Sequence, residues 1–222
     1  VIVEKPKDNE LLIKQTAIGV HFHDIYVRSG LYKTLELPGI LGLEAVGIVQ
    51  DVGNKSRDFN IGDRIGYITR NYGAYASHRV IDSKLAIKIP GYISDDVIAT
   101  NFSRAITVQM LMEQVTQVKP NDTILITAVT GGVGRLFCQW AKSKGACVIG
   151  SVGNDEKISL AHSLGCDYVF TYNQKDFVTQ IMDITKGNGV DKVFDSVGKD
   201  TFENSLKSIS AVSYTHLTLP TI

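Results

Sequence analysis

The chain has 222 residues, 23 basic and 23 acidic side chains, and no formal net charge at neutral pH. Such a balance argues against nucleic-acid binding, which favours an excess of basic side chains. No apolar run approaches the roughly 18 residues that cross a bilayer. Cys138, Cys147 and Cys166 are widely spaced and form no CxxC pair. Their spacing favours reduced thiols in a cytoplasmic protein over a disulfide framework or a structural zinc site.

The first part of the sequence, residues 1–95, predicts a β-rich domain. Short strand-like runs are separated by turn signals such as "VGNKS" and "IGD", a spacing typical of a compact β unit. Within it, a strand through "HFHD" would bring His21 and His23 to one face and suggest a metal site. The neighbouring Asp24 and Tyr26 equally suit a segment that turns. The predicted strands cover residues 11–20, 44–53, 63–68 and 84–89.

From residue 96 to 211 the pattern changes to alternating strands and helices. This alternation predicts an α/β domain with a doubly wound parallel sheet. About four β-α pairs are present, fewer than the six strands of a complete dinucleotide fold. The predicted strands are 123–129, 146–152, 168–172 and 192–197, and the predicted helices are 132–144, 155–164, 175–185 and one that begins near residue 200.

The last residues have an unusual sequence. "VSYTHLTLPT", residues 212–221, is what GTC TCT TAT ACA CAT CTG ACG CTG CCG ACG encodes, which resembles a transposase sequencing adapter read as coding DNA. A natural strand is the alternative, because Val, Tyr and Thr favour strands. We expect residues 212–222 to be a non-native tail and the second domain to be truncated at its C-terminus. The start at Val1, without Met, suggests that the first domain is truncated too.

A glycine turn follows the first strand of the second domain, in "TILITAVTGGVGRLFCQW". The order of strand, glycine turn, helix and second strand is the context that a dinucleotide fingerprint requires. Gly131 would let the backbone approach a pyrophosphate, and Gly134 would let the helix pack tightly on the strand. Val129 replaces the first glycine of the G-x-G-x-x-G pattern, so a simple helix entry is the alternative. Arg135 is either a further phosphate contact or a solvated helix residue.

The tip of the second strand bears on which dinucleotide binds. NAD enzymes usually have Asp or Glu there to bind the ribose 2′-hydroxyl, whereas residues 151–154 read "SVGN". Ser151, Lys157 and Tyr172 could instead bind a 2′-phosphate, which favours NADPH over NADH. Asp155 and Glu156 complicate this interpretation, although acidic residues in a first helical turn also suit the helix dipole.

Several ordered motifs together resemble the zeta-crystallin type of NADPH:quinone oxidoreductase, in the medium-chain dehydrogenase/reductase superfamily. The resemblance implies a GroES-like catalytic domain before a Rossmann NADP-binding domain, hydride transfer from NADPH to a quinone without metal, and cytosolic homodimers. The motifs are "AIGVHFHDIYVRSGLY", "LPGILGLEAVGIVQDVG", "GDRIGY", "TGGVGRLFCQWAKSKGA", "IGSVGNDEK" and "FDSVGKDTFENSL".

The resemblance also suggests site residues. Tyr26 would stack on a ring substrate or hydrogen-bond to it, and Arg28 is either a cationic site residue or part of a structural ion pair. His21 stands where the family has Asn, so it either donates a proton to the reduced quinone or only preserves a hydrogen bond. These three are the candidate catalytic residues. The candidate cofactor-binding residues are Arg104, Thr107, Gly131, Gly132, Val133, Gly134, Ser151, Lys157, Tyr172 and Ser196.

Zinc-containing members of the superfamily differ at the positions that matter. They have a catalytic Cys where this chain has His21, a His where it has Leu43, and a third ligand near "NFSRAIT", which contains no Cys. A catalytic zinc needs three protein ligands, and only His21 and Glu44 could serve. We therefore expect no zinc, and we expect His23 to be an exposed or capping polar residue.

Two alternatives remain open at this point. The same fold could reduce α,β-unsaturated ketones or aldehydes, because fold does not determine the acceptor. The second alternative is a non-catalytic protein related to lens crystallins or RNA-binding proteins, although the sequence has no basic patch to favour it. A small-molecule quinone or enone is the expected partner, with neither nucleic acid nor membrane.

Overall fold

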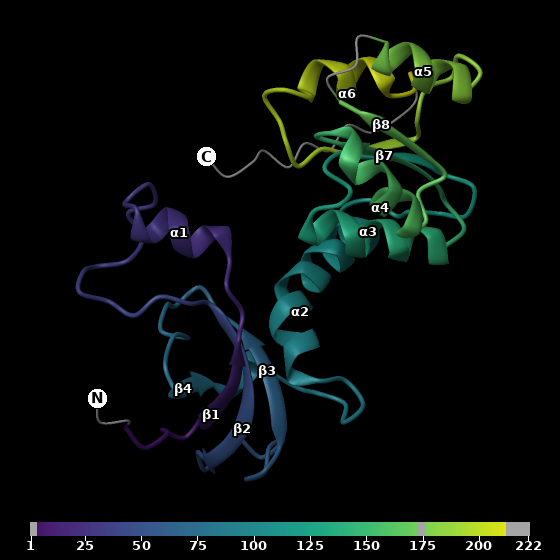
Figure 1. The fold of residues 1–222 in the computed structure, drawn as a ribbon. Helices are drawn as coiled ribbons and strands as arrows, with labels where there is room; N and C mark the ends of the chain where they lie inside the picture. Colours follow the sequence, from purple (N-terminus) through teal and green to yellow (C-terminus); the bar gives the residue numbers. More distant parts are fainter. Residues whose placement is uncertain (1–3, 173–175, 212–222) are drawn as a thin grey trace. The chain divides into compact units, whose positions relative to one another are not determined.

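The computed structural model describes residues 4–172 and 176–211, and these form two compact units (Figure 1). The division falls between Ser103 and Arg104, inside helix α2 (Asp95–Gln109). The sequence-based boundary after residue 95 lies at the start of that same helix. The expected tail at 212–222 lies outside the described residues.

The first unit is a five-stranded antiparallel sheet with the order β4-β1-β2-β3-β5. Its core lies on one face of the long strands, where Leu11, Ile13 and Val49 are fully buried. The strands are β1 (Glu10–Ile18), β2 (Glu44–Val52), β3 (Arg64–Ile68), β4 (His78–Asp82) and β5 (Ala86–Lys88), with a 3₁₀ turn at Ser83–Leu85 before β5.

Two elements of this unit differ from the sequence-based prediction. Residues 22–28 form a helix, α1 (Phe22–Arg28), where a strand through "HFHD" was one interpretation. The strand β4 lies in a stretch for which the sequence analysis made no prediction, and it pairs with the first half of β1. Its residues are mostly half-buried, so the apolar alternation that marks a strand is weak.

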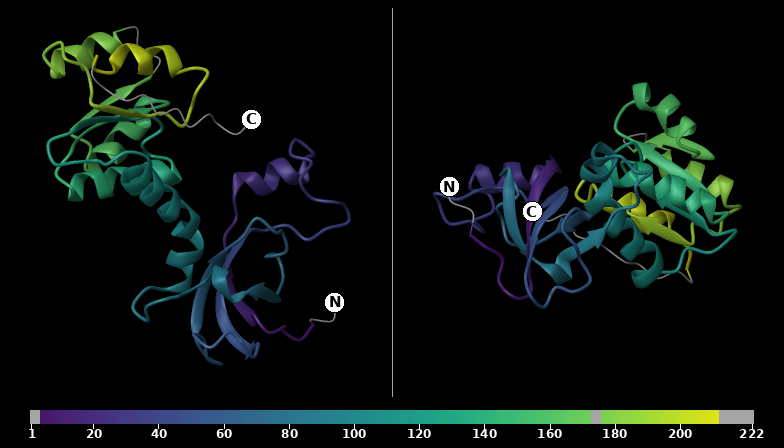
Figure 2. Two further views of the ribbon diagram at one scale, coloured as in Figure 1. Left: turned by 180° about the vertical axis from the view of Figure 1, so that it is seen from behind. Right: turned by 90° about the horizontal axis from the view of Figure 1, so that it is seen from below.

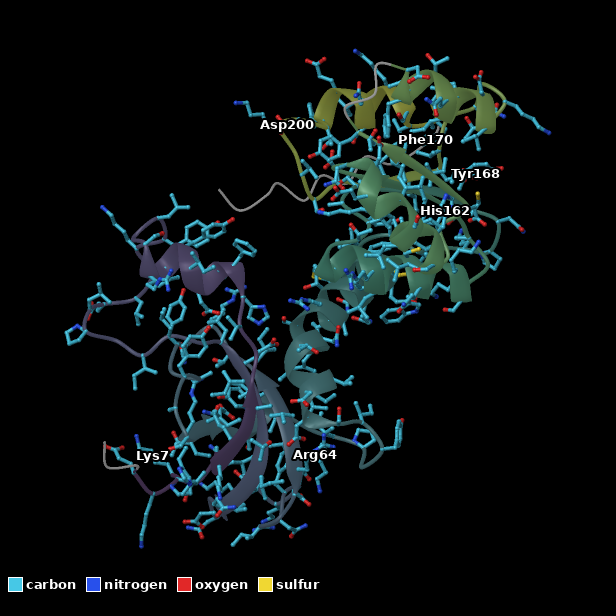
Figure 3. The ribbon with its side chains drawn as sticks, in the orientation of Figure 1. Lys7, Arg64, His162, Tyr168, Phe170 and Asp200 are labelled. Carbon is cyan, nitrogen blue, oxygen red and sulfur yellow. The ribbon has the colours of Figure 1, made fainter. Side chains whose placement is uncertain are left out.

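Hydrogen bonds from strand β3 of the first unit hold the beginning of helix α2. Arg64 on β3 donates from Nε to the Asp95 carboxylate at 2.5 Å and from Nη1 to the Pro90 carbonyl at 3.0 Å (Arg64 is labelled in Figure 3). A hydrogen bond from the Thr16 side chain, together with the Arg64 guanidinium, lowers the pKa of Asp95 although burial raises it. The helix then continues into a π-helical turn at Met110–Val115.

The second unit is a four-stranded parallel sheet with the order β8-β7-β6-β9. Ile124 and Ile126 pack with α3 and α4 on one face, while Leu125 packs with α5 on the other, so helices cover both faces (Figures 1 and 2). The doubly wound architecture is confirmed. Its elements are β6 (Thr123–Ile126), α3 (Gly132–Ser143), β7 (Cys147–Val152), α4 (Ile158–Ser163), β8 (Tyr168–Thr171), α5 (Phe177–Ile184), β9 (Lys192–Phe194) and α6 (Phe202–Ser208).

The strands of this sheet end earlier than the apolar runs suggest. β6 ends at Ile126 because Ala128 adopts a left-handed conformation, with φ +48°, which turns the chain into the glycine loop. β9 ends at Phe194 because the Asp195 carboxylate binds the next backbone N–H groups. Over residues 4–172 and 176–211, no helix combines the length and apolar character that crossing a membrane requires.

Candidate functional site

The glycine turn after β6 brings α3 into close contact with the preceding backbone. A Cβ on Gly134 would lie 2.6 Å from the Ala128 carbonyl oxygen, a distance that real Cβ atoms essentially never show. A Cβ on Gly132 would lie 2.7 Å from Nε of Arg104, whereas Gly131, the N-cap of α3, is exposed. The absence of side chains therefore lets α3 begin directly on the turn, and its first N–H groups stay uncovered by Cβ atoms at 131 and 132.

Val129 replaces a glycine of the usual fingerprint, and the structure explains how it fits. Its side chain is fully buried and points at Gly150 of β7, where an added Cβ would lie 2.7 Å from Cγ1 of Val129. Its N–H donates to the Ser151 carbonyl at 3.0 Å. The glycine on the neighbouring strand thus makes room for the valine on the turn.

Lys157 and Tyr172 lie near the carboxyl ends of β7 and β8. Lys157 is exposed in the 3₁₀ turn Asp155–Lys157, and Tyr172 is half-buried directly after β8. The Tyr172 hydroxyl would lie 3.3 Å from a Cβ on Gly153, so this phenol covers the end of β7. Ser151 instead is fully buried, and its Oγ has no hydrogen-bond partner among the described residues.

Asp195, which the sequence analysis did not single out, organises the loop after β9. Its Oδ1 accepts hydrogen bonds from Thr127 Oγ1 at 3.0 Å and from the N–H groups of Val197 and Gly198. Its Oδ2 accepts from the hydroxyls of Thr201 and Ser205 at 2.8 and 2.7 Å. Burial raises the pKa of Asp195, but these hydrogen bonds outweigh it and hold the pKa below its ordinary value.

This network positions Ser196 beside the end of β6. The Ser196 N–H donates to Thr127 Oγ1 at 2.8 Å, and its exposed hydroxyl donates to the Thr127 carbonyl at 3.4 Å. Because β6 and β9 are parallel neighbours, their carboxyl ends and the loops that follow lie at one edge of the sheet. Ser196 and the glycine turn therefore belong to the same edge.

Arg104 and Thr107 lie on α2 as expected. The Arg104 side chain lies against the glycine turn, since its Nε would be 2.7 Å from a Cβ on Gly132. Val133 is half-buried in the first turn of α3. Arg135 donates from Nε to the Thr130 carbonyl at 2.7 Å, so its guanidinium braces the turn.

In the first unit, His21 precedes α1 and lies against a buried carboxylate. His21 Nε2 is 2.6 Å from Oε1 of Glu44, whose side chain is only 1% exposed. Oε2 of Glu44 accepts the Ser103 N–H at 2.9 Å, and a Cβ on Gly19 would collide with the Glu44 carboxylate. The His21 N–H in turn donates to Asp24 Oδ2 at 2.9 Å, which caps the start of α1.

His23 has different partners, so the two imidazoles do not serve one site. His23 Nε2 is 2.8 Å from the Tyr72 hydroxyl, and the two rings are stacked. Tyr26 packs edge-on against Tyr32 at 5.4 Å between ring centroids, and Arg28 is exposed at the end of α1. The helical turn separates the histidines, which is why the shared face of a strand does not occur.

Tyr75 is a further residue of this region that the sequence analysis missed. Its hydroxyl donates to Asp24 Oδ2 at 3.0 Å, and burial together with the Asp24 carboxylate raises the pKa of Tyr75 to about 12. Tyr75 also lines a cavity of about 550 Å³ beside the second half of β1. Within the described ranges, no group of three or more His, Cys, Asp or Glu side chains could hold a metal ion.

Comparison with known proteins agrees with both units. A family model described as the alcohol dehydrogenase GroES-like domain matches residues 7–91, and one described as zinc-binding dehydrogenase matches residues 132–211. The 2-haloacrylate reductase crystal structure has a TM-score of 0.87 at 35% identity, covering 99% of this chain and 68% of that one. The structure of Escherichia coli quinone oxidoreductase complexed with NADPH has a TM-score of 0.90 at 39% identity, covering 97% and 66%.

Curated relatives agree with these structures. Quinone oxidoreductase 1 of Escherichia coli K12 is 43% identical over 202 residues, which is 90% of this chain and 62% of that protein. The 2-haloacrylate reductase of a Burkholderia species is 39% identical over 211 residues, covering 93% and 63%. The chain thus spans about 62% of the length of such relatives. It belongs to the quinone oxidoreductase branch of the medium-chain dehydrogenase/reductase superfamily, which confirms the resemblance drawn from its motifs.

The Asp195 network predicts a pH-dependent contribution to stability. Because the pKa of Asp195 in the folded chain lies below its ordinary 3.8, the carboxylate stabilises the fold fully above that value. The contribution is lost as the pH falls through the folded pKa. At pH 7, Asp195→Asn should lower the free energy of unfolding by roughly 1–3 kcal/mol, and the difference from wild type should shrink below about pH 4.

Urea unfolding followed by the fluorescence of Trp140, the single tryptophan of the chain, measures this in the second unit. Asp200→Asn, at an exposed aspartate labelled in Figure 3, is the matched control and should shift the curve little. Equal destabilisation by Asp195→Asn at pH 7 and at pH 2, well below the ordinary pKa of 3.8, would contradict the assigned charge.

Proposed function

We propose that the protein is an oxidoreductase that uses NADPH to reduce quinones without a metal ion. The observation that carries the proposal is the edge of the parallel sheet where the glycine turn, Lys157 and Tyr172 meet and the tip of β7 has no carboxylate. Support also comes from 43% identity to a protein named quinone oxidoreductase and from the likeness to a structure whose title names NADPH.

The residues present fit NADPH. Gly131 and Gly132 place no Cβ over the start of α3, which leaves it open to a pyrophosphate. A side chain at position 132 would also collide with Arg104. Lys157 and the Tyr172 phenol are a cation and a hydroxyl suited to a 2′-phosphate. Ser151 is fully buried and its carbonyl accepts the Val129 N–H, so it would support the tip of β7 without touching the cofactor. The chemistry supplied by bound NADPH is hydride transfer from its nicotinamide.

The other cofactor residues would surround this edge. Arg104 and Arg135 provide positive charge close to the glycine turn, and Arg135 also braces that turn through the Thr130 carbonyl. Ser196, held by Thr127, offers a hydroxyl at the carboxyl end of β9. Val133 and Thr107 complete the proposed set, the first by packing at the start of α3 and the second from α2.

On the substrate side, His21 is the proposed proton donor. Nε2 of His21 lies 2.6 Å from the buried Glu44 carboxylate, which orients the ring, and reduction of a quinone by hydride requires a proton to complete the hydroquinone. Tyr26 would offer a ring to stack on the quinone, and Arg28 would place a cation near its oxygens. Glu44 is bonded to His21 and to Ser103, which favours this role over zinc binding.

The proposal also covers where the protein acts and how it assembles. We expect a cytoplasmic protein, on the basis of three free cysteines. A homodimer is expected from the family resemblance, and β9 lies at an edge of the parallel sheet in the described part of the chain. The equal numbers of basic and acidic side chains argue against RNA binding.

The second candidate is reduction of an activated alkene. It is favoured by the 39% identity to a 2-haloacrylate reductase, a protein whose name specifies an alkene substrate. Both reactions begin with hydride delivery to an electron-poor carbon or ring, so the same cofactor site serves either.

Initial rates of NADPH oxidation distinguish the two. With 1,4-benzoquinone as acceptor, we expect kcat/KM to exceed that for 2-chloroacrylate and methyl vinyl ketone by roughly tenfold or more, about 1.4 kcal/mol of transition-state stabilisation. The reverse order would replace the quinone proposal by the alkene one, and no turnover with any acceptor would refute both.

Lys157→Ala tests cofactor choice. Loss of a charge-assisted hydrogen bond to the 2′-phosphate should raise the Kd for NADPH by about 10- to 100-fold, while the Kd for NADH should change little. Fluorescence titration with both nucleotides measures this. Lys207→Ala, which removes an exposed lysine on α6, is the control. Equal weakening of both nucleotides would exclude the 2′-phosphate role.

His21→Asn tests the proton donor. If the imidazolium donates, kcat of the wild type should fall as the pH rises through the titration of His21, and the variant should lose this dependence. His23→Asn, which alters the neighbouring imidazole bonded to Tyr72, should keep it. A pH profile that His21→Asn leaves unaltered would rule out proton donation.

A further inference from the structure

Two cysteines of the second unit lie almost in contact. Cys138 on α3 and Cys166, in the turn between α4 and β8, have their sulfur atoms 3.4 Å apart, although 28 positions separate them in sequence. Cys138 is fully buried and Cys166 is 6% exposed. Neither belongs to the candidate cofactor site, so their pairing needs its own explanation.

The surrounding backbone brings the two thiols together. Cys166 follows Gly165, whose φ of +103° reverses the chain after α4, and its sulfur would lie 2.9 Å from a Cβ on Gly150. Without side-chain atoms on Gly150, β7 leaves space for the Cys166 sulfur to reach Cys138.

Polar contacts hold this turn on both sides of Cys166. Nδ1 of His162, a residue labelled in Figure 3, lies 3.2 Å from the Cys166 carbonyl oxygen. Asp167 accepts the Val148 N–H at 2.7 Å and pairs with Lys142 of α3. The turn is therefore tied to both α3 and β7, which keeps the two sulfur atoms side by side.

The three thiols differ in chemical setting. The hydrogen bond from Cys166 lowers the pKa of Cys138 although burial raises it, and the Lys142 ammonium acts in the same direction as the bond. The bond to Cys138 and burial raise the pKa of Cys166. Burial also raises the pKa of Cys147, a half-buried residue with no sulfur partner among the described residues.

We propose that Cys138 and Cys166 are a redox-modification site that forms a reversible intramolecular disulfide with hydrogen peroxide. Peroxide oxidises one thiol to a sulfenic acid, with cleavage of the O–O bond and release of one water. The second thiol then attacks the sulfenic sulfur, and the sulfur–sulfur bond forms as a second water leaves. Two thiols and one peroxide thus give one disulfide and two waters, and a dithiol reductant reverses the change.

The bond would link α3 to the turn before β8. Both elements already pack in one core, so closing the remaining gap needs a small shift of the turn and no rearrangement of the sheet. A cross-link that closes this loop restricts the unfolded chain, and it should therefore stabilise the second unit. This inference does not depend on the proposed enzymatic function.

Peroxide treatment of the native protein tests the proposal. After removal of peroxide, the protein is denatured, free thiols are alkylated with N-ethylmaleimide, and the products are analysed by mass spectrometry. We expect one alkylated thiol, Cys147, and a linked peptide pair containing Cys138 and Cys166. Treatment with dithiothreitol before alkylation should restore three alkylated thiols, and the oxidised form should unfold at higher urea by Trp140 fluorescence.

Cysteine variants provide the controls. Cys147→Ser should still form the bond and show no alkylation after oxidation, whereas Cys138→Ser and Cys166→Ser should each retain two alkylated thiols. Three alkylated thiols in oxidised wild type, added oxygen atoms without a link, or a link through Cys147 would each overturn the proposal. Wild type and Cys147→Ser decide the matter even if the core variants fail to fold.

Discussion

The close approach of α3 to the turn after β6 is the constraint on which the second unit depends. Gly134 has no side chain where a Cβ would meet the Ala128 carbonyl, so the helix axis lies close to the sheet edge. That placement aims the first N–H groups of α3 at the end of the strands, and it buries Phe137 and Cys138 in the core. One packing requirement therefore creates both the proposed cofactor-binding edge and the hydrophobic layer beneath it.

Each unit contains a buried carboxylate whose hydrogen bonds hold the surrounding residues in place. Asp195 accepts hydrogen bonds from Thr127 after β6, from N–H groups after β9 and from Ser205 in α6, and it thereby fixes the loop that carries Ser196. Glu44 binds His21 on one side and the Ser103 backbone on the other. A buried carboxylate is stable only when its oxygens are hydrogen-bonded, so both acids fix the geometry of the residues around them.

Much of the site could be read from the sequence because it follows local patterns. The glycine turn, the order of strands and helices, and the lack of a carboxylate at residues 151–154 all depend on residues close together in the chain. The roles of Asp195 and Tyr75 could not be read in this way, since their partners lie up to 68 and 51 positions away. For "HFHD" the sequence left a strand and a turning segment open, and the structure has a helix whose start the Asp24 side chain caps.

The sequence by itself determined the class of fold, because apolar periodicity and glycine positions specify backbone geometry directly. Its motifs determined the family, and they predicted the type of cofactor site. Only the tertiary structure decided which side chains pair. It separated His21 from His23, joined His21 to Glu44, gave Val129 its space over Gly150 and brought Cys138 to Cys166. Such pairings arise from contacts between distant segments, and the packing of the whole unit selects them.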